Sequence, residues 1–160
     1  MAARRTVVII PCSKEKCWQT APHLGAVRAR DAYTSPLHKS AQRFAAANPG
    51  QWLILSALHG LLAPDDTIPG PYDVTFSRPD DPVISAVELA AQARRLRLAA
   101  ADELILLCPD DYCDHLRAAI GPTSARVQLP LAGVALSDLA RMQRRIDALP
   151  RPSERRRGDA

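Results

Sequence analysis

Four short apolar runs, separated by longer segments of helical character, are the feature that most limits what this chain can fold into. The runs cover residues 6–10, 52–55, 103–107 and 126–129, and each has the length of a buried strand. Helices are predicted for residues 35–48, 83–101, 110–120 and 137–149, with serine, proline or glycine at several of the ends. Strands that alternate with helices are typical of an α/β fold. We therefore expect a three-layer domain around a mainly parallel sheet of four or five strands.

The length and charge of the chain limit the classes of protein to which it can belong. Its 160 residues predict one domain over residues 1–149 and a disordered basic tail at 150–160. No apolar run approaches the roughly 18 residues of a membrane span, and none has the form of a signal peptide. We expect a cytoplasmic protein with no membrane partner; its oligomeric state stays open. The net charge of +4 lies partly in the tail, so charge gives little support for nucleic-acid binding.

Polar residues follow three of the predicted strands at the point where each strand ends. The first strand is followed by "PCSKEK", the second by "SALHG" and the third by "CPDDYC". Parallel strands share one carboxyl edge, and α/β proteins bind their ligands along that edge. We therefore expect Cys12, Ser56 and Cys108 to face one crevice.

The first of these segments has the composition of an anion-binding turn. Cys12 and Ser13 could present backbone N–H groups and a hydroxyl, while Lys14 and Lys16 add positive charge. A phosphate or a carboxylate would suit such a turn. The Gly-rich spacing of a phosphate-binding P-loop is absent. The alternative interpretation is a solvated loop in which Cys12 is only a small buried residue.

The stretch from residue 56 to residue 82 is long for a loop inside a compact domain, and such loops often carry function. It contains Ser56, His59, Gly60, Tyr72 and Asp73. A carboxylate and a histidine can act as acid and base or stabilise an oxocarbenium-like centre, and a tyrosine can stack on a base or a sugar. The alternative is that the tyrosine packs in the core and the carboxylates cap turns.

Tyr33 and the cysteines each allow two interpretations. Tyr33 precedes a helix start at Ser35 and could stack on a ligand or only pack against that helix. Cys12 and the three other cysteines have spacings that also occur in zinc sites, but cysteines at strand ends are commonly small buried residues. We therefore expect no metal and no other cofactor. A nucleophilic Cys12, activated by the nearby lysines, is the alternative.

Four motifs resemble a known group of bacterial proteins. They are "IPCSKEK", "AYTSPLHKSAQRFA", "WLILSALHGLLAPDDTIPGPYDVTF" and "LPLAGVALSDLARM", and they span most of residues 6–146. They are similar to the small YaaA-like domains of unknown function, a group associated with peroxide stress and DNA binding. A more distant likeness is to the Pro-Cys-Ser domain of archaeosine-type tRNA transglycosylase relatives, which has a uracil-DNA-glycosylase-like α/β fold. The segment after "PLAG" departs from the Gly-rich pattern of the group. The matching positions are Pro11, Cys12, Ser13, Lys14, Tyr33, Ser35, Ser56, Ala57, Gly60, Leu61, Pro71, Tyr72 and Asp73.

The resemblance implies a domain that handles a nucleoside, a nucleotide or a nucleic acid, and two classes of function follow. One is an enzyme that hydrolyses or transfers at an N-glycosidic bond. The other is a non-catalytic DNA- or RNA-binding stress-response module. For the enzyme, we assign Asp73 and His59 as catalytic residues. The substrate-binding residues would be Cys12, Ser13, Lys14, Tyr33, Ser56, Gly60 and Tyr72. Acidic and basic residues are mixed along the predicted edge, which favours a nucleoside- or nucleotide-like small molecule over a nucleic-acid duplex.

Overall fold

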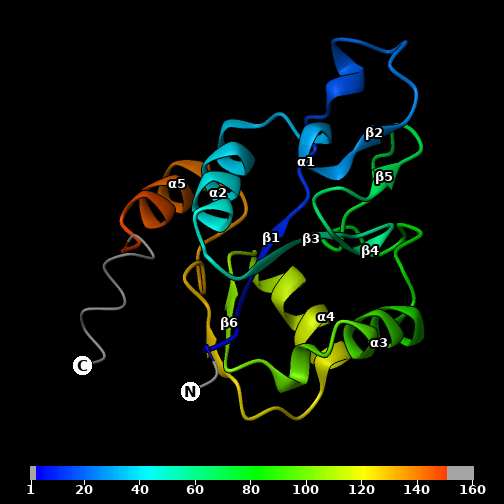
Figure 1. The fold of residues 1–160 in the computed structure, drawn as a ribbon. Helices are drawn as coiled ribbons and strands as arrows, with labels where there is room; N and C mark the ends of the chain where they lie inside the picture. Colours follow the sequence, from blue (N-terminus) through cyan, green and yellow to red (C-terminus); the bar gives the residue numbers. More distant parts are fainter. Residues whose placement is uncertain (1–2, 151–160) are drawn as a thin grey trace.

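The computed structural model describes residues 3–150, which contain a five-stranded sheet of order β4–β3–β1–β6–β7 (Figure 1). β1, β3, β6 and β7 are parallel, and β4 runs antiparallel to β3 at one edge. The prediction of an α/β fold with a mainly parallel sheet is confirmed. The strands are β1 (Thr6–Pro11), β3 (Gln51–Ser56), β4 (Gly60–Leu62), β6 (Glu103–Leu106) and β7 (Arg126–Gln128).

Two pairs of helices cover the two faces of this sheet. α2 and α5 pack on one face, and α3 and α4 pack on the other (Figure 1). Val7 and Ile9 of β1 belong to the core beneath α3 and α4, whereas Val8 and Ile10 belong to the core beneath α2 and α5. Because both faces are covered, the strand is apolar without interruption. The helices are α2 (Pro36–Ala46), α3 (Ala86–Arg95), α4 (Asp110–Ile120) and α5 (Leu139–Asp147).

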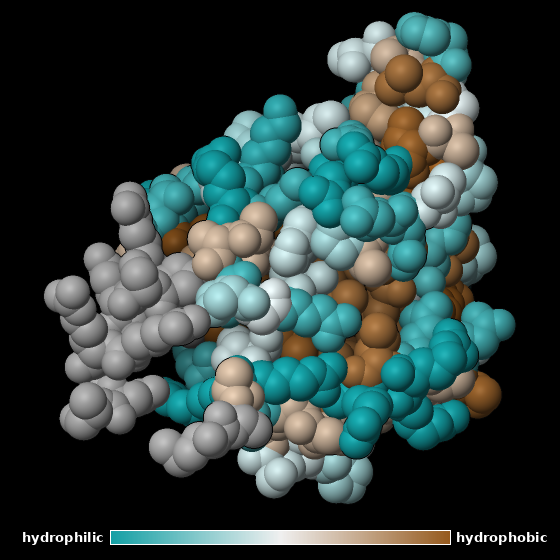
Figure 2. Space-filling model, in the orientation of Figure 1, coloured by the Kyte–Doolittle hydropathy of each residue, from teal (hydrophilic) through white to brown (hydrophobic). Residues whose placement is uncertain are grey.

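A smaller group of elements lies beyond the carboxyl edge of the sheet. β2 and β5 pair antiparallel there, and residues 17–28, here called the projecting segment, extend away from the sheet (Figure 1). On the face drawn in Figure 2, hydrophobic residues gather on this segment and in a second area below β4, toward α3 and α4, with hydrophilic residues around both areas. The small elements are η1 (Cys17–Gln19), β2 (Val27–Arg28), α1 (Ala29–Ala32) and β5 (Thr67–Ile68).

The helix predicted for residues 83–101 is wrong in its length. α3 ends at Arg95, and a separate 3₁₀ helix, η2 (Leu98–Ala100), follows Arg97, which adopts a left-handed φ of 52°. The guanidinium of Arg5 donates to the carbonyls of Leu96 (2.7 Å) and Arg97 (2.8 Å). Arg5 therefore caps the end of α3 from a distant part of the chain, and the helix stops there.

The stretch predicted as one long loop, residues 56–82, contains two short strands. β4 pairs with β3, placing Leu62 opposite Ile54, and β5 pairs with β2. Strands of two or three residues give no periodic pattern in a sequence, so the apolar pattern did not separate them from a loop.

Two further expectations concern the tail and the membrane. Residues 151–160 of the predicted tail lie outside the described residues. Within residues 3–150, none of the helices combines the length and the apolar composition needed to cross a membrane.

His38 in α2 is a buried histidine that should make stability depend on pH. Its side chain is 2% exposed, Nδ1 donates to the carbonyl of Pro11 (2.9 Å), and Nε2 lies 3.2 Å from Oε1 of Gln42. Burial lowers the pKa of His38 below its ordinary 6.5. Below that pH the unfolded chain binds a proton that the folded chain excludes, so the free energy of unfolding should fall as the pH drops from about 7.5 to about 5.5.

Urea unfolding across this pH range measures the effect. His38→Gln should flatten the dependence, whereas His23→Gln, at an exposed histidine, should leave it unchanged. His59, whose pKa is also lowered by burial, contributes in the same direction and accounts for a residual slope. An equal slope in the wild type and His38→Gln would contradict the prediction.

Candidate ligand-binding site

The ends of β1, β3 and β6 lie on one edge of the sheet. The backbone N–H of Cys12 donates to the carbonyl of Leu55 (2.9 Å), immediately before Ser56. On the other side of β1, the thiol of Cys108 lies 3.6 Å from the carbonyl of Ile9. The three strand ends therefore lie on one edge, as predicted, but Ser56 and Cys108 are buried and the three residues do not line a common pocket among the described residues.

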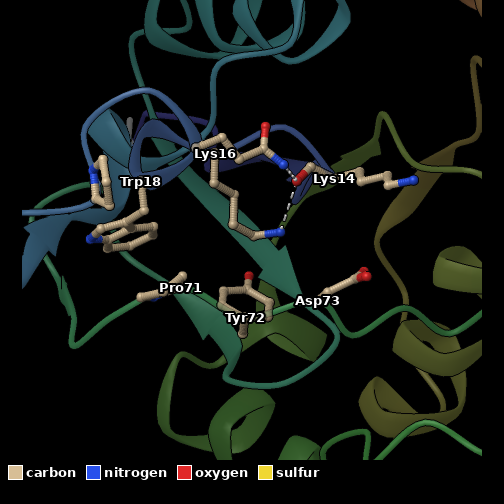
Figure 3. A pocket seen from close by; sticks show the side chains of 8 residues that line it. Lys14, Lys16, Trp18, Pro71, Tyr72 and Asp73 are labelled. Carbon is tan, nitrogen blue, oxygen red and sulfur yellow. Dashed lines mark hydrogen bonds between the residues drawn. The ribbon is translucent and has the colours of Figure 1, made fainter.

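A pocket of about 360 Å³ opens beside this edge. In Figure 3, Lys16 extends over the ring of Tyr72, with Trp18 and Pro71 to one side and Lys14 and Asp73 to the other. The pocket thus has an apolar, aromatic end and a charged end. The lining residues are Lys14, Lys16, Trp18, Gln19, Pro22, Pro71, Tyr72 and Asp73.

Lys16 is the most unusual side chain of the pocket, because it is a lysine with only 4% of its surface exposed. Nζ donates to the carbonyls of Ser13 (2.7 Å) and Lys14 (3.4 Å) and lies 4.4 Å from the centre of the Tyr72 ring. Within residues 3–150 it forms no ion pair with a carboxylate. Desolvation lowers the pKa of Lys16, and the nearby Cys12 and Asp73 oppose that shift. A desolvated ammonium without a carboxylate partner is stabilised by an anionic ligand.

A chain of buried hydroxyls fixes Tyr72 beneath Lys16. The hydroxyls of Tyr33 and Tyr72 hydrogen-bond to each other, and Tyr72 lies 2.8 Å from Oγ of Ser56. Ser56 is fully buried and also accepts from the backbone N–H of His59 (3.0 Å). Burial raises the pKa of both tyrosines, so both stay neutral. Tyr33 does not line the pocket; Tyr33 and Ser56 hold the ring that does.

Asp73 stands at the charged end and is held by an arginine. Its Oδ1 lies 2.9 Å from Nη2 of Arg78, which also donates to the Asp73 carbonyl (2.8 Å). Arg78 forms a second ion pair with Asp81 (2.8 Å). The hydrogen bond from Arg78 lowers the pKa of Asp73, so the carboxylate is ionised at neutral pH. Asp73 therefore presents a fixed negative charge to the pocket.

His59 and Gly60 lie next to the site without lining the pocket. The imidazole of His59 meets the edge of the Tyr72 ring, with the ring centres 5.0 Å apart. Gly60 is buried at a φ of 76°, and the side chain of Gln92 binds the backbone on both sides of it. The contacts with Gln92 give Gly60 a structural function in the turn. His59 contacts Tyr72, which lines the pocket, but does not line the pocket itself.

Cys12 and Ser13 lie outside the main pocket. They border a separate cavity of about 40 Å³, which is too small for a ligand of nucleotide size. Sγ of Cys12 lies 3.4 Å from the hydroxyl of Tyr112, and the hydroxyl of Ser13 donates to the carbonyl of Glu15 (2.8 Å). Across residues 3–150, no three His, Cys, Asp or Glu side chains form a group that could hold a metal ion.

Several pocket residues were absent from the sequence-based assignment. Lys16 was predicted to contribute only its charge, but the structure buries it, and its backbone forms an antiparallel bridge with that of Tyr33. Trp18 and Gln19 belong to η1, and the indole of Trp18 donates to the carbonyl of Gly25 (2.6 Å). A tryptophan beside two lysines at a strand end was the available signal, but no periodic pattern marks this segment.

Together, these observations describe an α/β domain with a pocket lined by lysines and aromatic residues at the carboxyl edge of its parallel strands. The chain belongs to the family of unknown function DUF6884, which matches residues 7–144. It is 42% identical over 117 residues to the uncharacterized protein YfjM of Bacillus subtilis (strain 168), covering 73% of this chain and 78% of that protein. These findings confirm the expectation of a bacterial domain of unknown function.

Proposed function

We propose that this domain binds a nucleotide-like ligand in the 360 Å³ pocket and acts at its N-glycosidic bond. The observation that carries the proposal is Lys16, a buried ammonium that contacts the ring of Tyr72 and has no carboxylate partner within residues 3–150. An anionic group would supply the missing charge, and a flat ring would suit the aromatic walls.

The two ends of the pocket suit the two ends of a nucleotide. Lys14 and Lys16 would bind the phosphate, Lys16 from the buried inner side of the pocket and Lys14 from the exposed rim. Trp18, Pro71 and Tyr72 provide apolar surface for the base and sugar. This ligand would lie with its sugar between the two ends and facing the charged end, which contains Asp73.

Asp73 is the residue suited to the chemistry. When the bond between C1′ and the base nitrogen breaks, positive charge develops on the sugar and the bonding electrons leave with the base, which takes up a proton. Water, or another acceptor hydroxyl, then forms the new bond at C1′ and loses a proton. The ionised carboxylate of Asp73, held by Arg78, would stabilise the sugar cation. The parallel sheet and the resemblance to uracil-DNA-glycosylase-like domains support the same proposal; in it, His59 acts indirectly, by orienting Tyr72.

Asp73→Asn should abolish base release while the affinity for the nucleotide that the wild-type protein cleaves changes by less than about threefold, because the amide has the same shape but no charge. The measurement is chromatography of free base after incubation with a panel of nucleosides, nucleotides and oligonucleotides. Asp80→Asn is the matched control, since this exposed carboxylate in the same loop forms no ion pair among the described residues. It should release base at the wild-type rate.

Two outcomes would contradict this function. Base release by Asp73→Asn at the wild-type rate would show that Asp73 is not a catalytic residue. If the wild-type protein cleaves no member of the panel but retards DNA or RNA in a gel, the non-catalytic nucleic-acid-binding module replaces the enzyme.

A further inference from the structure

Among the described residues, three charged side chains line the charged end of the pocket. Lys16 lies buried at its inner side and Lys14 is exposed at its rim, and among residues 3–150 Asp73 is the one carboxylate in the lining. Arg78 stands close by, but it is already paired with both Asp73 and Asp81. The lining therefore offers two cations to a ligand, with a negative charge directly beside them.

We infer that this pocket selects nucleoside monophosphates over both unphosphorylated nucleosides and nucleoside triphosphates. The inference rests on the proposed function and specifies its substrate class. One phosphate monoester carries roughly −1.5 to −2 charge at neutral pH, which the two lysines can balance. An unphosphorylated nucleoside leaves the desolvated ammonium of Lys16 without an anion.

A triphosphate would bring further negative charge that the lining has no cation to meet. The additional phosphates would lie at the same end of the pocket as the carboxylate of Asp73, where like charges repel. The turn formed by residues 12–16 contains no glycine, so it lacks the Gly-rich backbone that surrounds polyphosphates in P-loops. The volume of about 360 Å³ is near the lower end of the roughly 300–1,000 Å³ typical of ligand pockets.

Gln19 is suited to contact the base of such a ligand. Its side chain is exposed at the pocket, and the one hydrogen bond that this side chain forms within residues 3–150, to the carbonyl of Lys14, is long at 3.5 Å. The amide can therefore turn toward a ligand at little cost. A carboxamide offers a donor and an acceptor side by side, which matches the hydrogen-bonding edge of a nucleobase.

Isothermal titration calorimetry of the full chain, without divalent cations, tests the selectivity. The ligands are the nucleoside, the 5′-monophosphate and the 5′-triphosphate of each common base. The best monophosphate should bind at least roughly tenfold more tightly than its nucleoside and its triphosphate. In Asp73→Asn the difference in affinity between the monophosphate and the triphosphate should become smaller, because the carboxylate that repels the additional phosphates is gone.

Lys14→Met, a change at an exposed side chain that should not impair folding, should bring monophosphate affinity toward that of the nucleoside. Lys39→Met, on the exposed side of α2, is the matched control and should bind as the wild type does. If triphosphates or nucleosides bind as tightly as monophosphates, the inference fails and the proposed function stands. If no nucleoside or nucleotide binds at all, the proposed function fails as well.

Discussion

Lys16→Met is expected to weaken monophosphate binding by roughly a hundredfold, because hydrogen bonds to charged groups contribute about 1.5–3 kcal/mol and the ligand loses its one buried cation. Methionine has a similar length and keeps the contact with the Tyr72 ring. Titration calorimetry with the best-binding monophosphate measures the loss.

Folding stability should respond very differently from binding. Lys16→Met removes the cost of burying an ammonium but leaves the carbonyls of Ser13 and Lys14 without this donor, so the free energy of unfolding should change by less than about 1 kcal/mol. Lys39→Met controls for the general loss of a positive charge. Wild-type affinity in a folded Lys16→Met variant would show that the buried ammonium is structural and has no ligand.

The second large effect is expected at Gly60. Gly60→Ala should lower the free energy of unfolding by about 2–4 kcal/mol. The residue has a φ of 76°, and a Cβ added there would lie 2.1 Å from Oε1 of Gln92 and 2.5 Å from Cδ1 of Ile84. That same Oε1 accepts the N–H of Leu61 (2.7 Å), and Nε2 of Gln92 donates to the carbonyl of His59 (3.0 Å). Moving Gln92 aside would therefore break both hydrogen bonds.

Urea unfolding of Gly60→Ala beside Gly70→Ala provides a matched comparison. A Cβ at Gly70 meets no atom within 4 Å, so this substitution should change stability by no more than about 1 kcal/mol. Equal free energies of unfolding for the two variants would contradict the prediction and would mean that the Gln92 side chain can move away from the added Cβ at little cost.

The main strands and the start of α2 could be predicted because residues close together in the sequence determine them. The apolar β1, buried on both faces, and the Ser35 cap, whose hydroxyl accepts from the N–H of His38 (3.1 Å), are visible in a few consecutive residues. The end of α3 could not be predicted in this way, because it depends on Arg5, which is remote in the sequence. Local periodicity carries no information on such contacts.

The candidate site was predictable only in its position. Parallel strands dictate which edge carries the polar residues, so Lys14, Tyr72 and Asp73 were correctly placed near one another. Which side chains line the pocket depends on the projecting segment, where the indole of Trp18 is fixed by the carbonyl of Gly25. Tyr33 has an aromatic ring that could stack on a ligand, but the structure buries this residue behind Tyr72.

The position of β1 in the sheet affects how the chain can fold during synthesis. Among the strands of residues 3–150, β1 is synthesised before the others, but its pairing partners are residues 51–55 on one side and residues 103–106 on the other. The edge of β1 that pairs with β6 consequently stays unpaired until residues 103–106 have been synthesised. Long-range parallel pairing is slow, and an exposed apolar strand is prone to aggregate or to bind chaperones. We therefore expect the sheet to be completed only after β6 has been synthesised, because β6 pairs with both β1 and β7.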